Sequence, residues 1–328
     1  MRDVEAYSGN LEELTPSPRT VLALLLLDAE IARFFHHEPV IRHSLDQLSC
    51  IELDEAFAAR SATGWKSIMI EKAASRPTND SQATPLDPPS RNGTPSSSFP
   101  DVLSGLGLCV MLERIGSMAS ERPESASQQS QRALECQELL VSWFGKYRCT
   151  AIFQAQAPGL MMLWHSTFML LNMDLDALEC AAGREGNEEG KKYQEEAEAW
   201  ARSSRARKCI VHSVLVQRQF ERMRVGTVPP IHAPACLYRC GIAWYCYARF
   251  GAGIRPVPED RMKMPELEPL EIDGNRILLE DVALHVGKPL EPPVLRTVDL
   301  LQRISHWKVA EKLASTLLAL VDDGQSLY

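Results

Sequence analysis

Long apolar runs are missing from this sequence. The longest nearly uniform one, Val21–Leu27, is far shorter than the roughly 20 residues that a membrane-spanning helix requires. The stretch Met1–Asn10 is polar and acidic, whereas a secretory signal begins with basic residues and continues with an apolar segment. We therefore expect neither a membrane association nor a secretory signal.

The sequence also lacks the short motifs of several large enzyme classes. It has no Gly-x-Ser-x-Gly, no phosphate-binding loop pattern and no dinucleotide-binding glycine fingerprint. The nearest glycine cluster, Gly183-Arg184-Glu185-Gly186, follows a predicted helix, whereas the dinucleotide fingerprint follows a strand. No repeat of fixed period is evident, which argues against a solenoid of identical units. We therefore predict no catalytic and no cofactor-binding residue.

Charge and cysteine content restrict the partners and the compartment. With 35 basic and 43 acidic side chains the net charge is −8, which does not suit a chain that binds a phosphate backbone by itself. The nine cysteines are odd in number and scattered from Cys50 to Cys246 without a disulfide framework. A reducing compartment, either cytosol or nucleus, is expected for these thiols.

Apolar side chains recur at helical spacing through most of the chain and predict an all-α fold. The clearest case is Leu160–Leu171, which has one broad buried face. Asp174 is expected to cap a second helix, Leu175–Ala182, and Gly183 to terminate it. Connections are predicted at Arg148–Pro158, Gly251–Pro269 and Pro289–Pro293. The other predicted helices are Arg19–His36, Val40–Leu48, Asp54–Arg60, Thr63–Lys72, Val102–Met118, Ser127–Tyr147, Glu188–Met223, Ala235–Phe250 and Leu295–Val321.

We predict a single large, irregular helical domain with one insertion. Residues 1–18 form an N-terminal tail, residues 19–73 the first helical segment, and residues 101–328 the main helical part. Residues 74–100 are rich in Pro, Ser, Thr and Asn and nearly free of large apolar groups. Such a segment cannot offset its ordering entropy by burial, so we predict a disordered, flexible linker there.

Two groups of residues are the strongest candidates for chemistry. His232, Cys236, Cys240 and Cys246 suggest a metal site, but they fall on a predicted continuous apolar helix, whereas structural zinc sites place close cysteine pairs on turns. Core cysteines explain this group better, and no metal site is predicted. A basic run, Arg202–Lys208, is interpreted as a solvated helix face rather than an import signal or a phosphate-binding patch.

Acid–base chemistry is the other hypothesis that the residues raise. Asp174 and Asp176 are two residues apart and would diverge on a helix, so helix capping is favoured over a carboxylate pair or a magnesium site. His165 follows Trp164 on an apolar helix, and no partner nucleophile can be named. We interpret it as a hydrogen-bonded core histidine.

Two blocks of sequence carry a family resemblance. They read LWHSTFMLLNMDLDALECAAGREG from Leu163 and EAWARSSRARKCIVHSVLVQRQFERMRVGTVPPIHAPACLYRCGIAWYCYARF from Glu198. Together they resemble the regulatory (middle homology) domain of fungal-specific transcription factors, of the type that follows two-cysteine-two-histidine zinc fingers. DEAFAARSATGW, ending at Trp65, and LLQRISHWKVAEKLASTLLAL, from Leu300, are similar to flanking elements of that family. The residues that carry the family motif are Trp164, His165, Glu179, Gly183, Gly186 and Trp200.

The resemblance implies a nuclear, helical regulatory domain without catalysis, in which these six residues are structural. Such a domain modulates RNA polymerase II transcription through the transcriptional machinery or coregulators, and it can sense a small-molecule effector. The zinc fingers are absent from this sequence, so zinc and DNA contact would belong to a finger module outside it. Two alternatives stay open: a helical adaptor without a role in transcription, and an all-α lipid- or terpenoid-processing enzyme, which would need His165, Asp174 and Asp176 to converge on a cavity.

Overall fold

The computed structural model describes residues 18–41, 59, 61–74, 99, 104–121, 125–224, 226–251, 262–282 and 291–325. Within these ranges every regular element is a helix, which confirms the predicted all-α fold. None of the helices in the described ranges is long and apolar enough to span a membrane.

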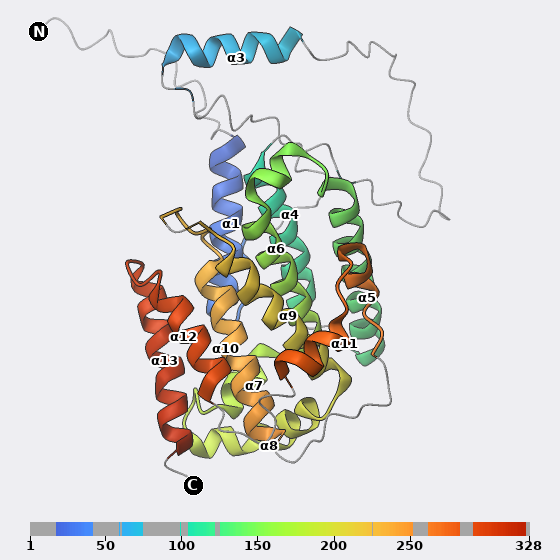
Figure 1. Ribbon diagram of the computed structural model, residues 1–328, viewed down its shortest axis with the longest axis vertical. Coiled ribbons are helices and arrows are strands. Elements are labelled where there is room, and N and C mark those ends of the chain that lie inside the picture. The colour runs from blue at the N-terminus through green and yellow to red at the C-terminus, as the bar shows by residue number, and fades with distance from the viewer. Residues whose placement is uncertain are drawn as a thin grey trace, which may run out of the picture.

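Three long helices form the centre of the bundle: α6 (Ala151–Asn172), α9 (Ser204–Glu221) and α10 (Ala233–Phe250). α6 lies along α9, and α10 packs on both (Figure 1). Trp164 and Phe168 of α6 are buried at this centre. All three helices have buried residues on most sides, so each requires neighbours around it to keep apolar surface from water.

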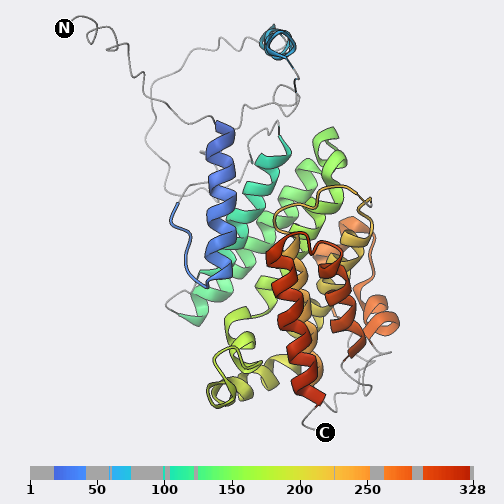
Figure 2. The same ribbon diagram turned by 90° about the vertical axis from the view of Figure 1, so that its left-hand side faces the viewer.

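The remaining helices surround this centre. α4 (Gly105–Ser120) packs on α6 and separates it from α1 (Pro18–Phe34), while α5 (Ala126–Tyr147) contacts both α4 and α6. α12 (Glu291–Gln302) and α13 (Lys308–Gln325) cover α10. Figure 2 shows α1 and α4 on one side of the bundle and α12 and α13 on the other.

Shorter elements complete the fold. α7 (Leu175–Ala181) and α8 (Asn187–Ala201) pack on each other at one end of the bundle (Figure 1). A 3-10 turn, η2 (Pro265–Leu270), precedes α11 (Gly274–Ile277) and the π turn η3 (Leu278–Val282). α3 (Ala62–Ala74) lies apart from the other helices in both views.

Side-chain caps set several helix starts. Asp174 accepts a hydrogen bond from the backbone N–H of Ala177 at 3.1 Å, which confirms it as the N-cap of α7. Thr150 caps α6 in the same way, so the predicted connection Arg148–Pro158 is wrong: the helix already begins at Ala151 and includes Pro158. The cap and the long apolar face that follows outweigh the one backbone hydrogen bond that a proline removes.

Two long helices predicted from periodicity are in fact helix pairs. Glu188–Met223 is divided into α8 and α9, because the Ser203 side chain accepts from the N–H of Ala206 at 3.1 Å and starts a new helix. Leu295–Val321 is divided into α12 and α13. The predicted proline-rich link at Pro289–Pro293 is wrong in part, since α12 begins at Glu291 and its prolines occupy the first turn, where a missing N–H costs little.

Two segments predicted to stay at the surface reach the core. Phe99, at the end of the predicted 74–100 linker, is buried against Tyr147, and its carbonyl accepts from the Lys146 ammonium. Glu266, within the predicted excursion Gly251–Pro269, is buried in η2. Almost all of the remaining linker lies outside the described residues, as do most of the helices predicted at residues 40–48 and 54–60.

Candidate functional site

A large cavity of about 1230 Å³ lies between the ends of α1, α4 and α6, the first half of α5, and helices α7 and α8. Small-molecule sites usually measure about 300–1,000 Å³, so this cavity has room for an organic ligand. One wall comes from the first block that carries the family resemblance, because residues 170–178 all line the cavity. Phe168 and Trp200 add aromatic surface to the lining.

Two buried arginines also line the cavity. Arg33 of α1, 8% exposed, forms an ion pair with Glu30 at 3.0 Å and a second ion pair with Glu113 of α4. Burial lowers the pKa of Arg33. The negative charge of Glu30 opposes this effect, and the positive charge of Arg239 reinforces it. The Nε and Nη1 atoms of Arg33 are buried without a hydrogen-bond partner.

Arg239 of α10 is only 2% exposed. Its Nη1 donates to Ser166 Oγ of α6 at 2.8 Å and lies 4.0 Å from Cys236 Sγ. Within the described part of the chain it forms no ion pair. A charged side chain at this depth normally pairs with an opposite charge, and here the carboxylate of Glu30 acts on Arg239 through space without forming an ion pair with it.

A second polar group lies at the contact between α6 and α9. His165 Nδ1 is 3.1 Å from His212 Nδ1, and His212 Nε2 is 3.5 Å from Glu266 Oε1 of η2. Burial lowers the pKa of both imidazoles, so both are neutral at neutral pH. Burial alone would raise the pKa of Glu266, but the contact with His212 brings it below its usual value. The prediction of a hydrogen-bonded core histidine at His165 is confirmed.

Glu179 of α7 holds the end of α1 in place. Its carboxylate accepts from His36 Nε2 at 2.7 Å and from Arg184 Nη1 at 2.8 Å. Burial would raise the pKa of Glu179, but hydrogen bonds from His36, Arg184 and Tyr238 lower it below its usual value. His36 has a φ of +54°, unusual for a residue other than glycine, and the contact with Glu179 helps to retain that conformation.

The other residues of the family motif fix helix positions. Trp164 Nε1 donates to the Leu140 carbonyl of α5 at 2.9 Å, and Trp200 Nε1 donates to the Asn172 carbonyl at the end of α6 at 2.8 Å. Gly183 and Gly186 have φ values of +102° and +91°, which strain any residue with a β-carbon. They form the turn that connects α7 to α8.

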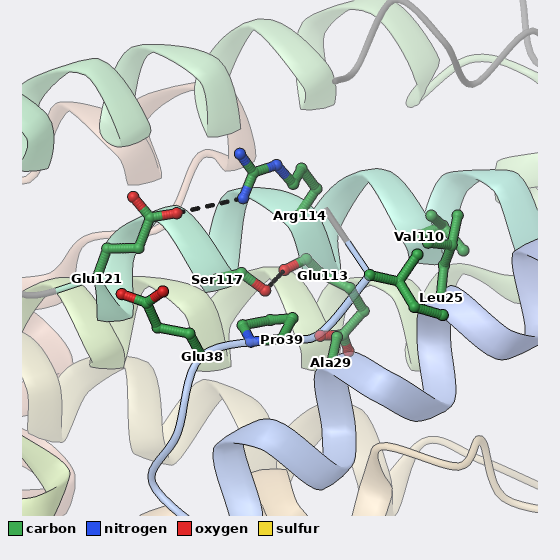
Figure 3. Close-up of a pocket in the computed structure, with 10 residues that line it drawn as sticks. Leu25, Ala29, Glu38, Pro39, Val110, Glu113, Arg114, Ser117 and Glu121 are labelled. Atoms are coloured by element: carbon green, nitrogen blue, oxygen red, sulfur yellow. Dashed lines mark hydrogen bonds and ion pairs between the residues drawn. The ribbon is translucent and has the colours of Figure 1, made fainter. Parts of the chain in front are cut away.

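A much smaller pocket, of about 20 Å³, lies between α1 and α4. Figure 3 shows Glu113 and Ser117 of α4 beside Ala29 of α1 and Pro39. This volume is enough for about one water molecule. The large cavity is therefore the better candidate for a ligand.

The other predicted candidates are not brought together as sites. Cys240 Sγ faces the carbonyls of Cys236 and Ser213, Cys246 Sγ faces that of Leu178, and His232 Nε2 lies 3.0 Å from that of Gly159. No group of three or more His, Cys, Asp or Glu side chains in the described ranges is arranged to hold a metal ion.

Asp174 and Asp176 both line the large cavity, but His165 does not join them. Asp174 caps α7, Asp176 pairs with Arg184 at 2.6 Å, and His165 contacts His212. The basic run Arg202–Lys208, predicted within one helix, instead spans the break between α8 and α9.

Sequence reasoning missed the buried charges. Arg239 stands in an almost wholly apolar predicted helix, and Glu113 follows the apolar run Leu108–Leu112, so both could have been recognised as charges on buried faces. Glu266 does not stand in or beside an apolar run, so its burial could not be recognised from the sequence in this way. No protein-family model, no curated protein and no solved structure matches this chain.

Proposed function

We propose that this chain is the regulatory domain of a fungal transcription factor and acts in the nucleus. It modulates RNA polymerase II transcription through coregulators or the transcriptional machinery and responds to a small-molecule effector. One observation carries the proposal: residues 170–178, within the block that resembles the family, form a wall of the 1230 Å³ cavity. A molecule bound there would contact the family-like block directly.

Both family-like blocks connect the cavity to the helices around it. Glu179 binds His36 at the end of α1, and Trp200 binds the end of α6. A change of occupancy that shifts α7 is therefore transmitted to α1 and α6 through polar contacts.

A tethered reporter assay tests the regulatory role. The chain is fused to a heterologous DNA-binding domain, and nascent reporter transcripts are measured against the DNA-binding domain alone. We expect a change in transcription that requires the tether, together with nuclear enrichment of the tagged chain. A folded, nuclear fusion that leaves transcription unchanged would refute the proposal, and exclusion from the nucleus would favour the adaptor alternative.

A further inference from the structure

One wall of the large cavity can accept a negative charge. Arg239 lines it, and Ser166 Oγ is its closest described acceptor, because Cys236 Sγ at 4.0 Å is distant and weak. Arg33, which is already paired with Glu30 and Glu113, adds a second positive charge to this wall. Charged donors are costly to leave unsatisfied in an apolar interior, so an acceptor on a bound molecule would stabilise this wall.

Apolar surface from the end of α6 and from α7 and α8 lines the same cavity. Leu170 and Leu171 follow one another along α6, and Leu175 and Trp200 extend the surface. The Trp200 indole already donates to the Asn172 carbonyl, so its remaining contribution is an aromatic face. A ligand body that covers these side chains has to be apolar.

The total charge of the lining restricts the head group. Six acidic side chains, among them Asp174, Glu196 and Glu266, line the cavity against five arginines and lysines. The lining therefore has no excess of positive charge that would favour a polyphosphate or another polyanion. A head with one negative charge gains the guanidinium contact without a large repulsion, and a carboxylate matches the planar guanidinium fork.

We propose that the cavity binds a small amphipathic carboxylate, with its head on Arg239 and its apolar body along Leu170 and Leu171. The proposal deepens the regulatory function proposed above, because such a molecule would be the effector. Binding is a property of the isolated chain, so it is measured independently of transcription. A chain that binds the carboxylate but fails in the reporter assay would overturn the regulatory role alone.

Calorimetric titration of the full chain with octanoate, octanol and octylamine tests the proposal. These probes share one apolar chain and differ in the charge of the head. We expect octanoate to bind at least about tenfold more tightly than octanol, and octylamine to bind weakest. Equal affinity for octanoate and octanol, or no measurable binding of octanoate, would overturn the anionic site.

Variants on α10 locate the head group. Arg239→Met removes the charge but keeps a long buried side chain, and we expect it to abolish the preference for octanoate over octanol. The control is Arg249→Met on the same helix, whose guanidinium lies over Tyr245 and Phe250 and does not line the cavity. A folded Arg239→Met chain that keeps the preference would contradict the assignment. If that variant does not fold, the three octyl probes on the unaltered chain still decide whether the site is anionic.

Discussion

His165 Nδ1 lies 3.1 Å from His212 Nδ1, and both rings are fully buried. A hydrogen bond between two neutral imidazoles needs one donor and one acceptor, so the rings adopt complementary tautomers. The Glu266 carboxylate faces His212 Nε2, which favours a proton on that nitrogen. We therefore assign His212 Nδ1 as the acceptor and His165 Nδ1 as the donor.

Replacement of His212 by Phe is expected to lower the free energy of unfolding by about 3 kcal/mol. The new ring keeps its stacking against Phe168, but His165 Nδ1 and the Glu266 carboxylate lose their partner. Urea denaturation measures the free energy of unfolding of the two single variants and of the double variant His165→Phe/His212→Phe. The double variant should lose less than the sum of the singles, and additive losses would show that the two rings are not coupled.

Glu179→Gln is expected to destabilise the fold by about 1–3 kcal/mol at neutral pH, because it weakens the contacts with His36 and Arg184. The folded pKa of Glu179 lies below its ordinary value of 4.5, so its stabilising contribution is present above that pH and is lost as the pH falls through the folded pKa. Thermal unfolding of the unaltered chain and of Glu179→Gln, from neutral pH into acid, should show the difference in their stability shrinking as the pH falls.

Glu185→Gln, at a more exposed partner of Arg184, is the control and should change stability little. A gap between Glu179→Gln and the unaltered chain that stays constant with pH would argue against an ionised Glu179.

Alanine at Gly183 or Gly186 is expected to cost about 1–2 kcal/mol, because both positions have a positive φ that a β-carbon strains. Gly145→Ala is the opposite control. It lies inside α5 with open space around the added carbon, and we expect it to stabilise by about 0.5–1 kcal/mol. Chemical denaturation measures the stability of the three variants. Equal effects at all three glycines would contradict the requirement for a positive φ in the α7–α8 turn.

Alkylation of the folded chain should distinguish exposed from buried thiols. Cys149 is exposed, whereas burial raises the pKa of Cys136 and of Cys240 to about 12 and keeps both as unreactive thiols. We expect iodoacetamide near pH 8 to label Cys149 before the other cysteines of the described ranges, as read by mass spectrometry. Rapid labelling of Cys240 in the native chain would contradict its burial.

Metal content tests the predicted absence of a zinc site in the α10 segment. The thiols of Cys236, Cys240 and Cys246 face carbonyls or other core groups. We therefore expect no stoichiometric zinc after purification in its presence, as measured by plasma mass spectrometry. One bound zinc per chain, lost in Cys240→Ser, would show that the segment rearranges to bind metal.

The sequence by itself determined the fold class, the existence of most helices and the cap at Asp174. Periodic apolar positions identify a helix wherever its buried face is continuous, and Asp174 caps α7 through a contact three residues away. Periodicity could not detect the breaks at Ser203 and between Gln302 and Lys308, because apolar spacing continues on both sides of each break. The burial of His165 was predictable for the same local reason.

Only the tertiary structure decided the partners of the buried polar groups. Glu30, Arg33 and Glu113 belong to two helices, and Arg239 meets Ser166 from α6 across more than 70 positions of sequence. Such contacts depend on how helices pack, and helical spacing within one segment carries no information about which neighbour it faces. The cavity has the same origin, since it is the space that the ends of separate helices leave between them.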